Sequence, residues 1–565
     1  MADTKLSALT ELAATPADDD EVYIRDVSEV ASAESKRVRK GRIARAFGAG
    51  WTANKLLKGA GAGADPTEII PGSLAATCIV VANDAKAEIK TWAGILQAAG
   101  YPVWVCDGTA DDVEIQAAIG AMTGGGLISL TDGTFNLAAT VTINTGGISV
   151  KGVNEARTII KPGGAFAAIT IGSAGSPNQV FLEDFSIVDP TPNTATGISL
   201  PGTGVANSPG RIHIEAITLK DLATGLSGNW IQAMWLDGCW FDNCRTKAIN
   251  ILNISELRVS RTAFWGAGTA KGVLIDSDKA VLAGGVTFDN CWFVDCEETA
   301  LEIRDQYMIF LTDCLWDAGM VGNNIKLLRC NDLHIVNNSI GATTGTNSAI
   351  YGEDLEDFFI FFNQISTSSK AGIEIQKVGA TRPARGKITG NIIGSPSQDG
   401  ILIPNAIYVD IEGNIVFGIG GTNTYSGIRT GSATTNFDEG KIRGNRTYAV
   451  TSAKYSWEHL GGNACEYGNN DFKSGTTGVQ SVAGIQHLAL PSLFDNKPTA
   501  GSGASTGTGV QQTIAHGLSY TPTTAQIMLW DIENGASPYH SAAPDATNIY
   551  VTAVLNQDWG WATVP

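Results

Sequence analysis

Short alternations of apolar and polar residues recur through the middle of the chain. Segments such as AINI, ALEI, NIKL, GIEI and GILI place an aliphatic residue on each side of one variable residue. A period of two is typical of a strand, whereas the apolar residues of a helix recur every three or four positions. The pattern predicts many short strands whose aliphatic residues point inward. The predicted inward pairs include Ile249 and Ile251, Val273 and Ile275, Leu301 and Ile303, Ile325 and Leu327, Ile373 and Ile375, and Ile401 and Ile403.

A second pattern gives these strands a common repeat. The octet DGCWFDNC at 237–244 returns as DNCWFVDC at 289–296, and a degraded copy between them has Thr262 in place of the first cysteine. Further along, the same position is held by cysteine and then by asparagine, at intervals of about 22 to 31 residues. Such intervals are typical of one coil of a solenoid. The residues at this position are Cys239, Cys291, Cys314, Asn338, Asn363, Asn391, Asn414 and Asn445.

A parallel β-helix accommodates both patterns. Each coil pairs with the coils about 4.8 Å above and below it, so like residues stack in columns. An asparagine tolerates a left-handed turn and can hydrogen bond to the next asparagine in its column, while cysteine is a small apolar filler there. Cys239 and Cys291, about 9.6 Å apart, are too far for a disulfide, but Cys291 and Cys314 lie on neighbouring coils.

Carboxylates follow the second alternating strand and the turns beyond it. Glycoside hydrolysis needs two carboxyl groups about 5 to 9.5 Å apart, and adjacent or alternate coils supply such spacings. Any long β-helix with acidic turns meets the same condition, so a solvated acidic ridge and a calcium site are the alternatives to catalysis. The candidate catalytic residues are Glu302, Asp305, Asp332 and Glu353.

Composition and charge narrow the class of function. The 66 glycines suit a β-rich chain with many tight turns. A formal net charge of −18 repels phosphate backbones, so we expect no nucleic-acid partner. No run of about 18 apolar residues exists, so we expect no membrane insertion. The nine cysteines include no metal-type CxxC pair and the N-terminus has no signal-peptide pattern. We therefore expect free thiols, no metal site and no cofactor.

Two strings resemble a known family. CDGTADDVEIQAAI, followed by GGGLISLTDGTFNL, resembles the entry segment of the pectate-lyase-like right-handed β-helix domains of tailed-phage tailspikes. The opening MADTKLSALTELAATPADDDEVYIRDVSE is similar to a segment that begins many phage structural proteins. The resemblance implies an all-β virion spike with a right-handed, single-stranded parallel β-helix. It also implies a homotrimer made in the host cytoplasm, attached to another virion protein by its N-terminus and bound to host cell-surface polysaccharide.

The first of these strings predicts a helix that covers the open end of the first coil. Thr109 is the expected N-cap, and acidic residues after it complement the helix dipole. The apolar stripe expected to cover the exposed strand edge is Val113, Ile115, Ala118 and Ile119.

The chain divides into five predicted regions. A virion-anchoring region at 1–70 precedes a short α/β connector at 71–105, and the β-helix occupies 106–470. A linker at 471–510 leads to a β-rich domain at 511–565, where TTAQIMLW and NIYVTAVL suggest a small β-sandwich. In the first region, the basic stretch at 36–45 is either solvated or docks on an acidic partner.

Aromatic residues are frequent in the last region. They serve either as core and subunit contacts or as a platform for sugars, since aromatic faces stack on the apolar faces of sugars. These candidate ligand-binding residues are Trp530, Tyr539, Tyr550, Trp559 and Trp561.

The sequence leaves several functions open. The leading hypothesis is a virion tailspike or fibre that binds host glycans. A second hypothesis adds depolymerase activity, as a glycoside hydrolase or lyase. A head or collar fibre and a cellular β-helix adhesin are further alternatives.

Overall fold

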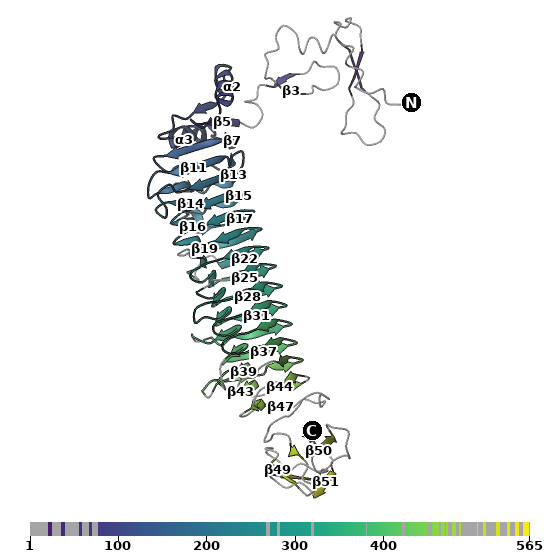
Figure 1. The fold of residues 1–565 in the computed structure, drawn as a ribbon. Coiled ribbons are helices and arrows are strands. Elements are labelled where there is room, and N and C mark those ends of the chain that lie inside the picture. The colour runs from purple at the N-terminus through teal and green to yellow at the C-terminus, as the bar shows by residue number, and fades with distance from the viewer. Residues whose placement is uncertain are drawn as a thin grey trace.

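The computed structural model describes residues 77–486 with short gaps, and beyond them the backbone of a few short terminal strands. The gaps are 267–271, 279–282, 318–320, 380, 421–423, 433, 449–454, 463–464, 469, 473–476 and 482–484. From β5 (Thr77–Val81) to β47 (Ile485–Gln486) the strands form a parallel β-solenoid of about 14 turns, stacked along one axis (Figure 1). The predicted parallel β-helix is confirmed.

Three stacks of parallel strands make up the solenoid. The long strands β13, β15 and β19 bend and belong to two stacks each. The first stack contains β7 (Gly126–Leu130), β10 (Ile148–Lys151), β13 (Asn178–Val188), β15 (Gly210–Lys220), β17 (Met234–Asp237), β19 (Lys247–Ser260), β22 (Ala283–Asp289), β25 (Tyr307–Thr312), β28 (Asn331–Val336), β31 (Glu356–Phe361), β34 (Ala384–Thr389), β37 (Ala406–Glu412), β41 (Lys441–Arg443), β44 (Cys465–Gly468) and β47 (Ile485–Gln486), with β40 (Phe437–Asp438) beside β37.

The second stack follows the first after a tight turn. Besides parts of β13 and β15, it contains β8 (Gly133–Leu137), β11 (Thr158–Pro162), β18 (Trp240–Asp242), β20 (Ala263–Trp265), β23 (Trp292–Val294), β26 (Leu315–Trp316), β29 (Ser339–Ile340), β32 (Gln364–Ser366), β35 (Ile392–Gly394), β38 (Ile415–Phe417), β42 (Arg446–Tyr448) and β45 (Asp471–Phe472). The third stack contains β9 (Val141–Ile143), β12 (Ala167–Ile171), β14 (Thr196–Pro201), β16 (Thr224–Ile231), β21 (Val273–Asp276), β24 (Leu301–Arg304), β27 (Ile325–Leu328), β30 (Ile350–Glu353), β33 (Ile373–Gln376), β36 (Ile401–Ile403), β39 (Ser426–Thr430), β43 (Tyr455–His459) and β46 (Thr477–Ser481).

The third stack has the register that the alternating segments predict. Ile249 pairs with Val273, which pairs with Leu301 and then with Ile325, and all four are at most 1% exposed. All the other predicted inward residues are equally buried. Aliphatic side chains therefore fill the inside of the solenoid from coil to coil.

The repeated octet is explained by the second stack. Phe241 and Phe293 point inward and stack through Phe264 between them, with ring centroids 5.0 and 4.7 Å apart. Trp240 and Trp292, one residue earlier, point outward and are 43% and 53% exposed. Each WF pair thus supplies one outward and one inward ring.

The Cys/Asn column lies at the turn between the first and second stacks and forms a continuous ladder. The main-chain N–H and the Nδ2 of Asn338 both donate to Oδ1 of Asn363 at 2.9 Å, and the same pair of bonds joins Asn363 to Asn391. Asn414 and Asn445 continue it, and Asn470, which the sequence reading missed, extends it by one coil. The predicted ladder is confirmed.

The expectation that the asparagines of this column adopt the left-handed turn conformation is wrong. The residue with positive φ is the one before the ladder position, for example Asn337 at 56°, Phe362 at 55° and Gly390 at 68°. Asparagine is therefore selected for its amide hydrogen bonds and not for the left-handed turn.

The cysteines of the described chain are buried and free. The N–H of Cys291 donates to Sγ of Cys314 at 3.4 Å, and that of Cys239 to Oγ1 of Thr262 at 3.4 Å. Sulfur and hydroxyl groups thus take the place of the amide oxygen in the earlier coils.

Two helices precede the coils. α2 (Ala87–Ala98) packs against β5 and β6 (Val103–Val105), while α3 (Asp112–Ala121) packs against the first-coil strands β8 and β9. Thr109 is not the N-cap, because its hydroxyl donates to Asp107 and the helix begins three residues later. Val113 is 60% exposed, so only the rest of the predicted stripe is buried. No described helix has the length and apolar character needed to cross a bilayer.

The sheet reaches beyond the range expected for the β-helix. It includes β5 and β6 from the expected connector, and β46 and β47 from the expected linker. A 3-10 turn, η3 (Val205–Asn207), interrupts the connection between β14 and β15.

The terminal strands pair antiparallel. β1 (Glu21–Ile24) pairs with β2 (Lys36–Arg39), and β3 (Leu56–Lys58) with β4 (Thr67–Ile69). Near the C-terminus, β48 (Ser505–Thr506), β53 (Asp558–Thr563) and β50 (Ile527–Asp531) form one sheet, and β49 (Gln512–Ala515), β52 (Asn548–Thr552) and β51 (Tyr539–Ala542) form another. The two strands predicted there correspond to β50 and β52.

We expect Asn391→Ala to destabilise the fold by about 3 kcal/mol. It leaves the buried N–H and Nδ2 groups of Asn363 without their acceptor, and each unsatisfied buried group costs about 1 to 3 kcal/mol. The measurement is the free energy of unfolding in guanidinium chloride. Cys291→Ala, in the sulfur part of the ladder, is the control and should cost about 1 kcal/mol. Equal losses in the two variants would contradict a ladder held by amide hydrogen bonds.

Candidate functional site

The outward face of the first stack carries a ladder of rings. Phe181, His213 and Trp235 occupy the same outward position on β13, β15 and β17. Their ring centroids are 4.6 and 4.5 Å apart, with interplanar angles of 13° and 19°. A second set, Phe310, His334 and Phe359, continues the same column on β25, β28 and β31.

The ladder of rings is interrupted between these two sets. The next residues in the column after Trp235 are Arg258 on β19 and Thr287 on β22. The ring of Trp235 is the last of its set, so one of its faces has no aromatic neighbour in the column. A groove of about 540 Å³ lies at this interruption.

The groove runs along the axis of the solenoid. Its lining comes from five successive coils, β15 to β25, which corresponds to a length of about 19 Å. The lining residues are His213, Ile214, Glu215, Trp235, Leu236, Asp237, Arg258, Val259, Ser260, Thr287, Asp289 and Thr312.

One edge of the groove is acidic. Glu215, Asp237, Ser260 and Asp289 share one outward position on consecutive coils. Oδ1 of Asp237 accepts hydrogen bonds from Nε of Arg261 at 2.8 Å and from Ser260 at 2.9 Å. The hydrogen bond from Arg261 holds the pKa of Asp237 below its usual range.

The imidazole of His213 belongs to the apolar side of the groove. Burial lowers the pKa of His213, although Glu183 and Glu215 act in the opposite direction. The ring is therefore neutral near pH 7 and stacks as an aromatic group between Phe181 and Trp235.

The carboxylates and rings of the groove are better suited to binding a ligand than to transferring a proton. Glu215 and Asp237 stand on adjacent coils, about 4.8 Å apart, a spacing near that of the carboxyl pair of a retaining glycosidase. A general acid needs a raised pKa, whereas that of Asp237 is lowered. The arrangement provides an aromatic face, carboxylate and hydroxyl acceptors, and one guanidinium.

The sequence reading missed this groove. Its signal was present in the strings VFLED, IHIEA and MWLDG, which each put an aromatic or imidazole ring and then an acid at the two outward positions of a strand. The candidate residues of the sequence analysis come from the outward positions and turns of the alternating strands that form the third stack, and not from these strings.

Two of the predicted catalytic residues, Glu302 and Asp305, lie on the third stack and its turn, among basic partners. Oε1 of Glu302 accepts from Nε of Arg304 at 2.6 Å and lies 3.6 Å from Nζ of Lys326. Asp305 forms a two-point ion pair with Arg329 on the next coil, at 2.8 and 2.5 Å. A cation thus stands beside each of these carboxylates.

Of the other two predicted residues, Glu353 is on β30 of the third stack, two coils beyond Glu302, and Asp332 is on the first stack. Asp332 is the second residue of β28, and its Oδ1 lies 3.3 Å from Nε2 of His334. Glu353 accepts from the hydroxyl of Tyr351 at 2.7 Å, and burial together with this bond raises the pKa of the tyrosine. Catalysis by these four residues stays a prediction.

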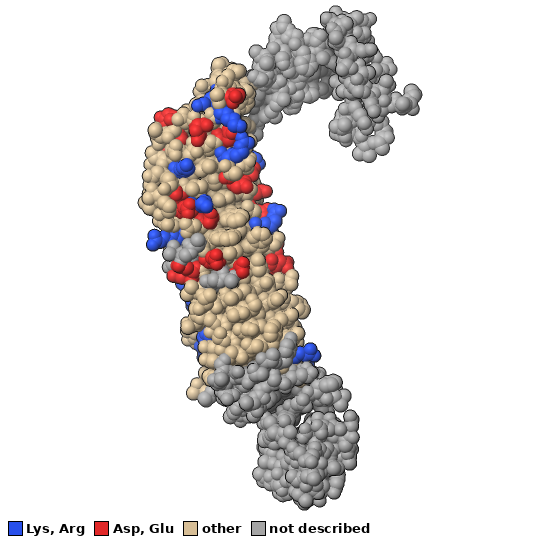
Figure 2. All heavy atoms as spheres, in the orientation of Figure 1, with Lys and Arg blue, Asp and Glu red and all other residues tan. Residues whose placement is uncertain are grey.

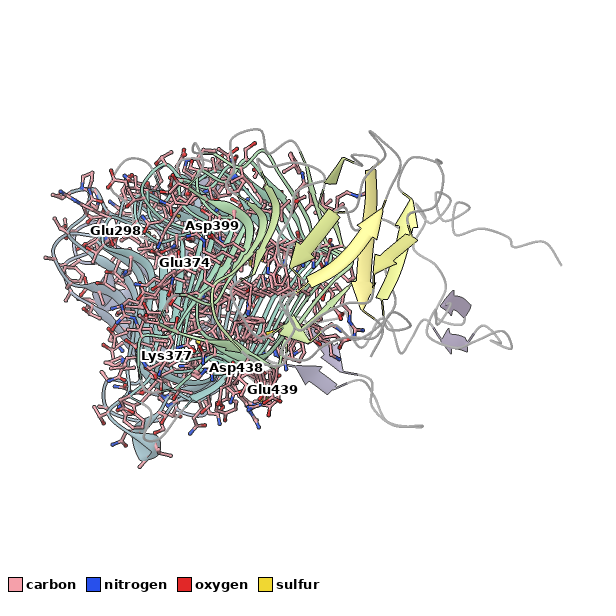
Figure 3. All side chains as sticks on the ribbon, turned by 90° about the horizontal axis from the view of Figure 1, so that it is seen from below. Glu298, Glu374, Lys377, Asp399, Asp438 and Glu439 are labelled. Carbon is pink, nitrogen blue, oxygen red and sulfur yellow. The ribbon has the colours of Figure 1, made fainter. Side chains whose placement is uncertain are left out.

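Further along the third stack, three carboxylates are almost completely buried. Glu374, Asp399 and Glu458 are each 1% exposed. Viewed along the axis, Glu374 and Asp399 lie on the same side of the coils (Figure 3). Lys370 donates to Glu374 at 2.6 Å, and Nε of Arg429 donates to Glu458 at 2.8 Å.

Of the three carboxylates, Asp399 has the most distant cation, so its negative charge is the least compensated. It accepts the N–H of Ser426 at 2.6 Å, but the guanidinium of Arg429 is 3.4 Å away. Burial raises its pKa to about 6. Because it is enclosed and holds a main-chain N–H, we assign it to the support of the loops and not to chemistry on a ligand.

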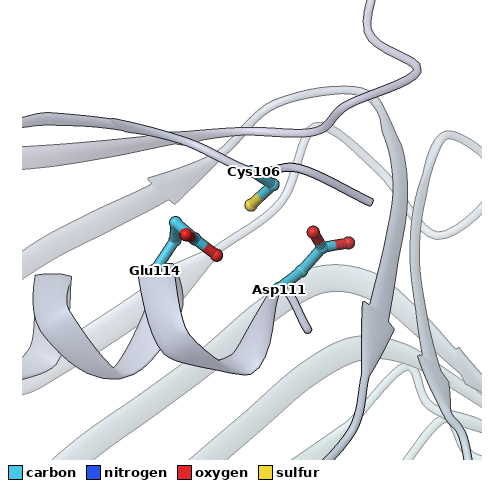
Figure 4. Close-up of side chains that lie close together, drawn as sticks. All are labelled: Cys106, Asp111 and Glu114. Carbon is cyan, nitrogen blue, oxygen red and sulfur yellow. The ribbon is translucent and has the colours of Figure 1, made fainter. Parts of the chain in front are cut away.

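One group of possible metal ligands occurs among the described residues. Cys106, Asp111 and Glu114 have ligand atoms within 4.8 Å of one another (Figure 4). Both oxygens of Asp111 accept main-chain N–H groups, from Gly108 at 2.8 Å and Asn136 at 2.7 Å, and burial raises the pKa of Cys106 and keeps it a thiol. Three ligands also fall short of the four of a structural zinc site. The group ties α3 to the first coil.

The aromatic residues predicted to bind sugars lie on the terminal strands. Trp530 is on β50, Tyr539 on β51, Tyr550 on β52, and Trp559 and Trp561 on β53. Their side chains are outside the described part of the chain, so their role stays a prediction.

Comparison with known proteins gives the following. No protein-family model matches the chain, and a search of curated proteins finds no match. Among solved structures, it is similar to the A-module of a mannuronan C-5 epimerase from Azotobacter vinelandii, with 14% identity over 67% of this chain and 96% of that chain and a TM-score of 0.39.

Two phage proteins are among the other similar structures. Tailspike protein 3 of bacteriophage CBA120 has 14% identity over 72% of this chain and 63% of that chain, with a TM-score of 0.37. The pre-mature gene product 12 of bacteriophage phi29 has 11% identity over 68% of this chain and 55% of that chain, with a TM-score of 0.42. Such values carry no argument about function, and the fold rests on the strand pairings themselves.

We expect Asp399 to make the stability depend on pH. Its folded pKa of about 6 is above the ordinary aspartate value of 3.8. Its stabilising contribution is therefore complete below about pH 4 and is lost as the pH rises through 6, a change of about 3 kcal/mol at most. Asp399→Asn keeps an acceptor for Ser426, and unfolding at several pH values should show a flatter profile than that of the wild type between pH 4 and 7. Identical profiles would contradict this role.

Proposed function

We propose that the chain is a spike or fibre of a tailed-phage virion and binds a host surface glycan in the groove between Trp235 and Phe310. The observation that carries the proposal is the interruption of an outward ring column by a groove with an acidic edge. Sugars present an apolar face that stacks on an aromatic ring and hydroxyls that donate to carboxylates. The groove offers both kinds of group side by side.

The rigidity of the solenoid supports this role. Trp235, Asp237 and Arg258 sit on strands that are paired on both sides within the coil stack. A site built on such elements is held in place before the ligand arrives, so less conformational entropy is lost on binding. A stiff stalk also keeps the groove at a fixed distance from the particle.

The proposal includes a homotrimer, which follows from the resemblance to tailspikes. An exposed group of tryptophans on the second stack supports it, because contiguous exposed apolar surface is typical of contact sites. Trp240 and Trp292 share one outward column, with Ala263 between them, and Trp265 lies in the neighbouring outward column. Trp240, Trp265 and Trp292 are 43%, 44% and 53% exposed. Three grooves on one spike would raise a weak affinity for a repetitive glycan through avidity.

The proposed virion attachment has a direct test. The chain should be found in purified particles by mass spectrometry, and immunogold labelling of its N-terminal region should lie closer to the particle than labelling of its C-terminal region. The purified protein should have the mass of a trimer by light scattering. Absence of the chain from washed particles would reject the virion assignment.

The proposed groove is tested by Trp235→Ala. Loss of an aromatic stacking partner costs about 0.5 to 1.5 kcal/mol beyond the buried area, so adsorption of the purified protein to host cells should fall about threefold to tenfold. Trp92→Ala is the matched control, since Trp92 is 47% exposed on α2 and lies outside the groove. Equal adsorption by both variants would move the binding site away from the groove.

A further inference from the structure

The charges of the groove are only partly compensated within the protein. Asp237 is paired with Arg261, and Nε of Arg258 lies 2.8 Å from Oε1 of Glu256. Two carboxylates are left. Neither the carboxylate of Glu215 nor that of Asp289 has a lysine, arginine or histidine nitrogen within salt-bridge distance among the described side chains. Among these side chains, the carboxylate of Asp289 accepts a hydrogen bond from the hydroxyl of Thr312, at 2.7 Å.

The two remaining carboxylates have a defined geometry. Glu215 and Asp289 share one column and are three coils, or about 14 Å, apart along the acidic edge. Both are exposed. They therefore face a ligand lying along the groove at two separate points, on either side of the paired Asp237.

The shape of the site adds to the effect of this negative edge. On the face drawn in Figure 2, Lys and Arg are interspersed with Asp and Glu over the N-terminal half of the solenoid. A concave site with one sign of charge concentrates ligands of the opposite sign. The column of rings beside the acidic edge can stack on the apolar face of a sugar but supplies no charge.

We propose that the groove selects linear glycans that carry free amino groups and excludes acidic polysaccharides. An ammonium group donates to a carboxylate at each of the two points, while a uronic acid or phosphate placed there meets repulsion. This inference rests on the proposed function, because it takes the groove as the glycan site and adds the chemical class of its ligand.

The experiment compares three tetrasaccharides of different charge on the full-length protein. Chitotetraose is cationic, its fully N-acetylated form is neutral, and tetragalacturonate is acidic. Saturation-transfer NMR and calorimetry near pH 6 should give the affinity order chitotetraose, acetylated form, tetragalacturonate. The preference should weaken as the salt concentration is raised to about 0.15 M, because salt screens exposed charges.

Variants separate charge from stacking. Glu215→Gln together with Asp289→Asn should lower the affinity for chitotetraose about fivefold and leave that for the acetylated form unchanged, since exposed charges each contribute less than about 1 kcal/mol. Trp235→Ala should weaken both. Glu155→Gln, at an exposed acid in the turn before β11, is the matched control and should change neither.

The outcomes distinguish this inference from the proposed function. If tetragalacturonate binds best and loses its affinity in Trp235→Ala, the groove binds glycans but the selection proposed here is wrong. If chitotetraose binding is insensitive to the double variant, the two carboxylates are not its partners. If the affinities for the sugars are the same in Trp235→Ala as in the wild type, or if none of the sugars binds, the groove is not the glycan site and both proposals fail.

Discussion

Each coil of this chain is held by main-chain hydrogen bonds to the coil before it and the coil after it, so the register of one coil fixes the register of the next. A shift by one residue would turn every inward side chain outward. Inward positions are therefore filled by residues of similar size, such as Ile249, Val273 and Leu301, which pair directly. The amide ladder imposes the same condition at the turn, because each Oδ1 must reach two donors of the preceding asparagine.

The left-handed positions show how this stacking accommodates strain. Asp305 and Arg329, one coil apart, have φ of 53° and 54°, and Asp357 and Arg385 have 47° and 53°. A positive φ costs a residue such as arginine about 1 kcal/mol or more. Stacking puts each arginine beside an aspartate of the previous coil, and both pairs form two-point ion pairs. The ion pairs offset part of that cost.

The same constraint explains which parts of the molecule could be predicted. Inward and ladder positions repeat in the sequence because stacking requires it, so Cys239 through Asn445 could be aligned without a structure. Outward positions have no such requirement, and the column Trp235, Arg258, Thr287, Phe310 shows no repeat that a period search would find. The surroundings of the predicted acids could not be foreseen for a related reason: the sequence does not show that Arg304, Lys326 and Arg329 lie beside Glu302 and Asp305.

The outward rings are not needed to fill the interior of the solenoid, because inward residues already do so. On β15 and β17, Ile212, Ile214, Met234 and Leu236 fill the interior and are at most 1% exposed. His213 and Trp235 add nothing to that core, yet they place apolar rings on the solvent side, where polar residues would serve the fold equally well. Stacking on one another hides part of each ring, but the face of Trp235 toward Arg258 has no aromatic neighbour. The packing of the solenoid does not require a ring at the end of a groove with carboxylates along one edge, and this arrangement supports the ligand site that we propose.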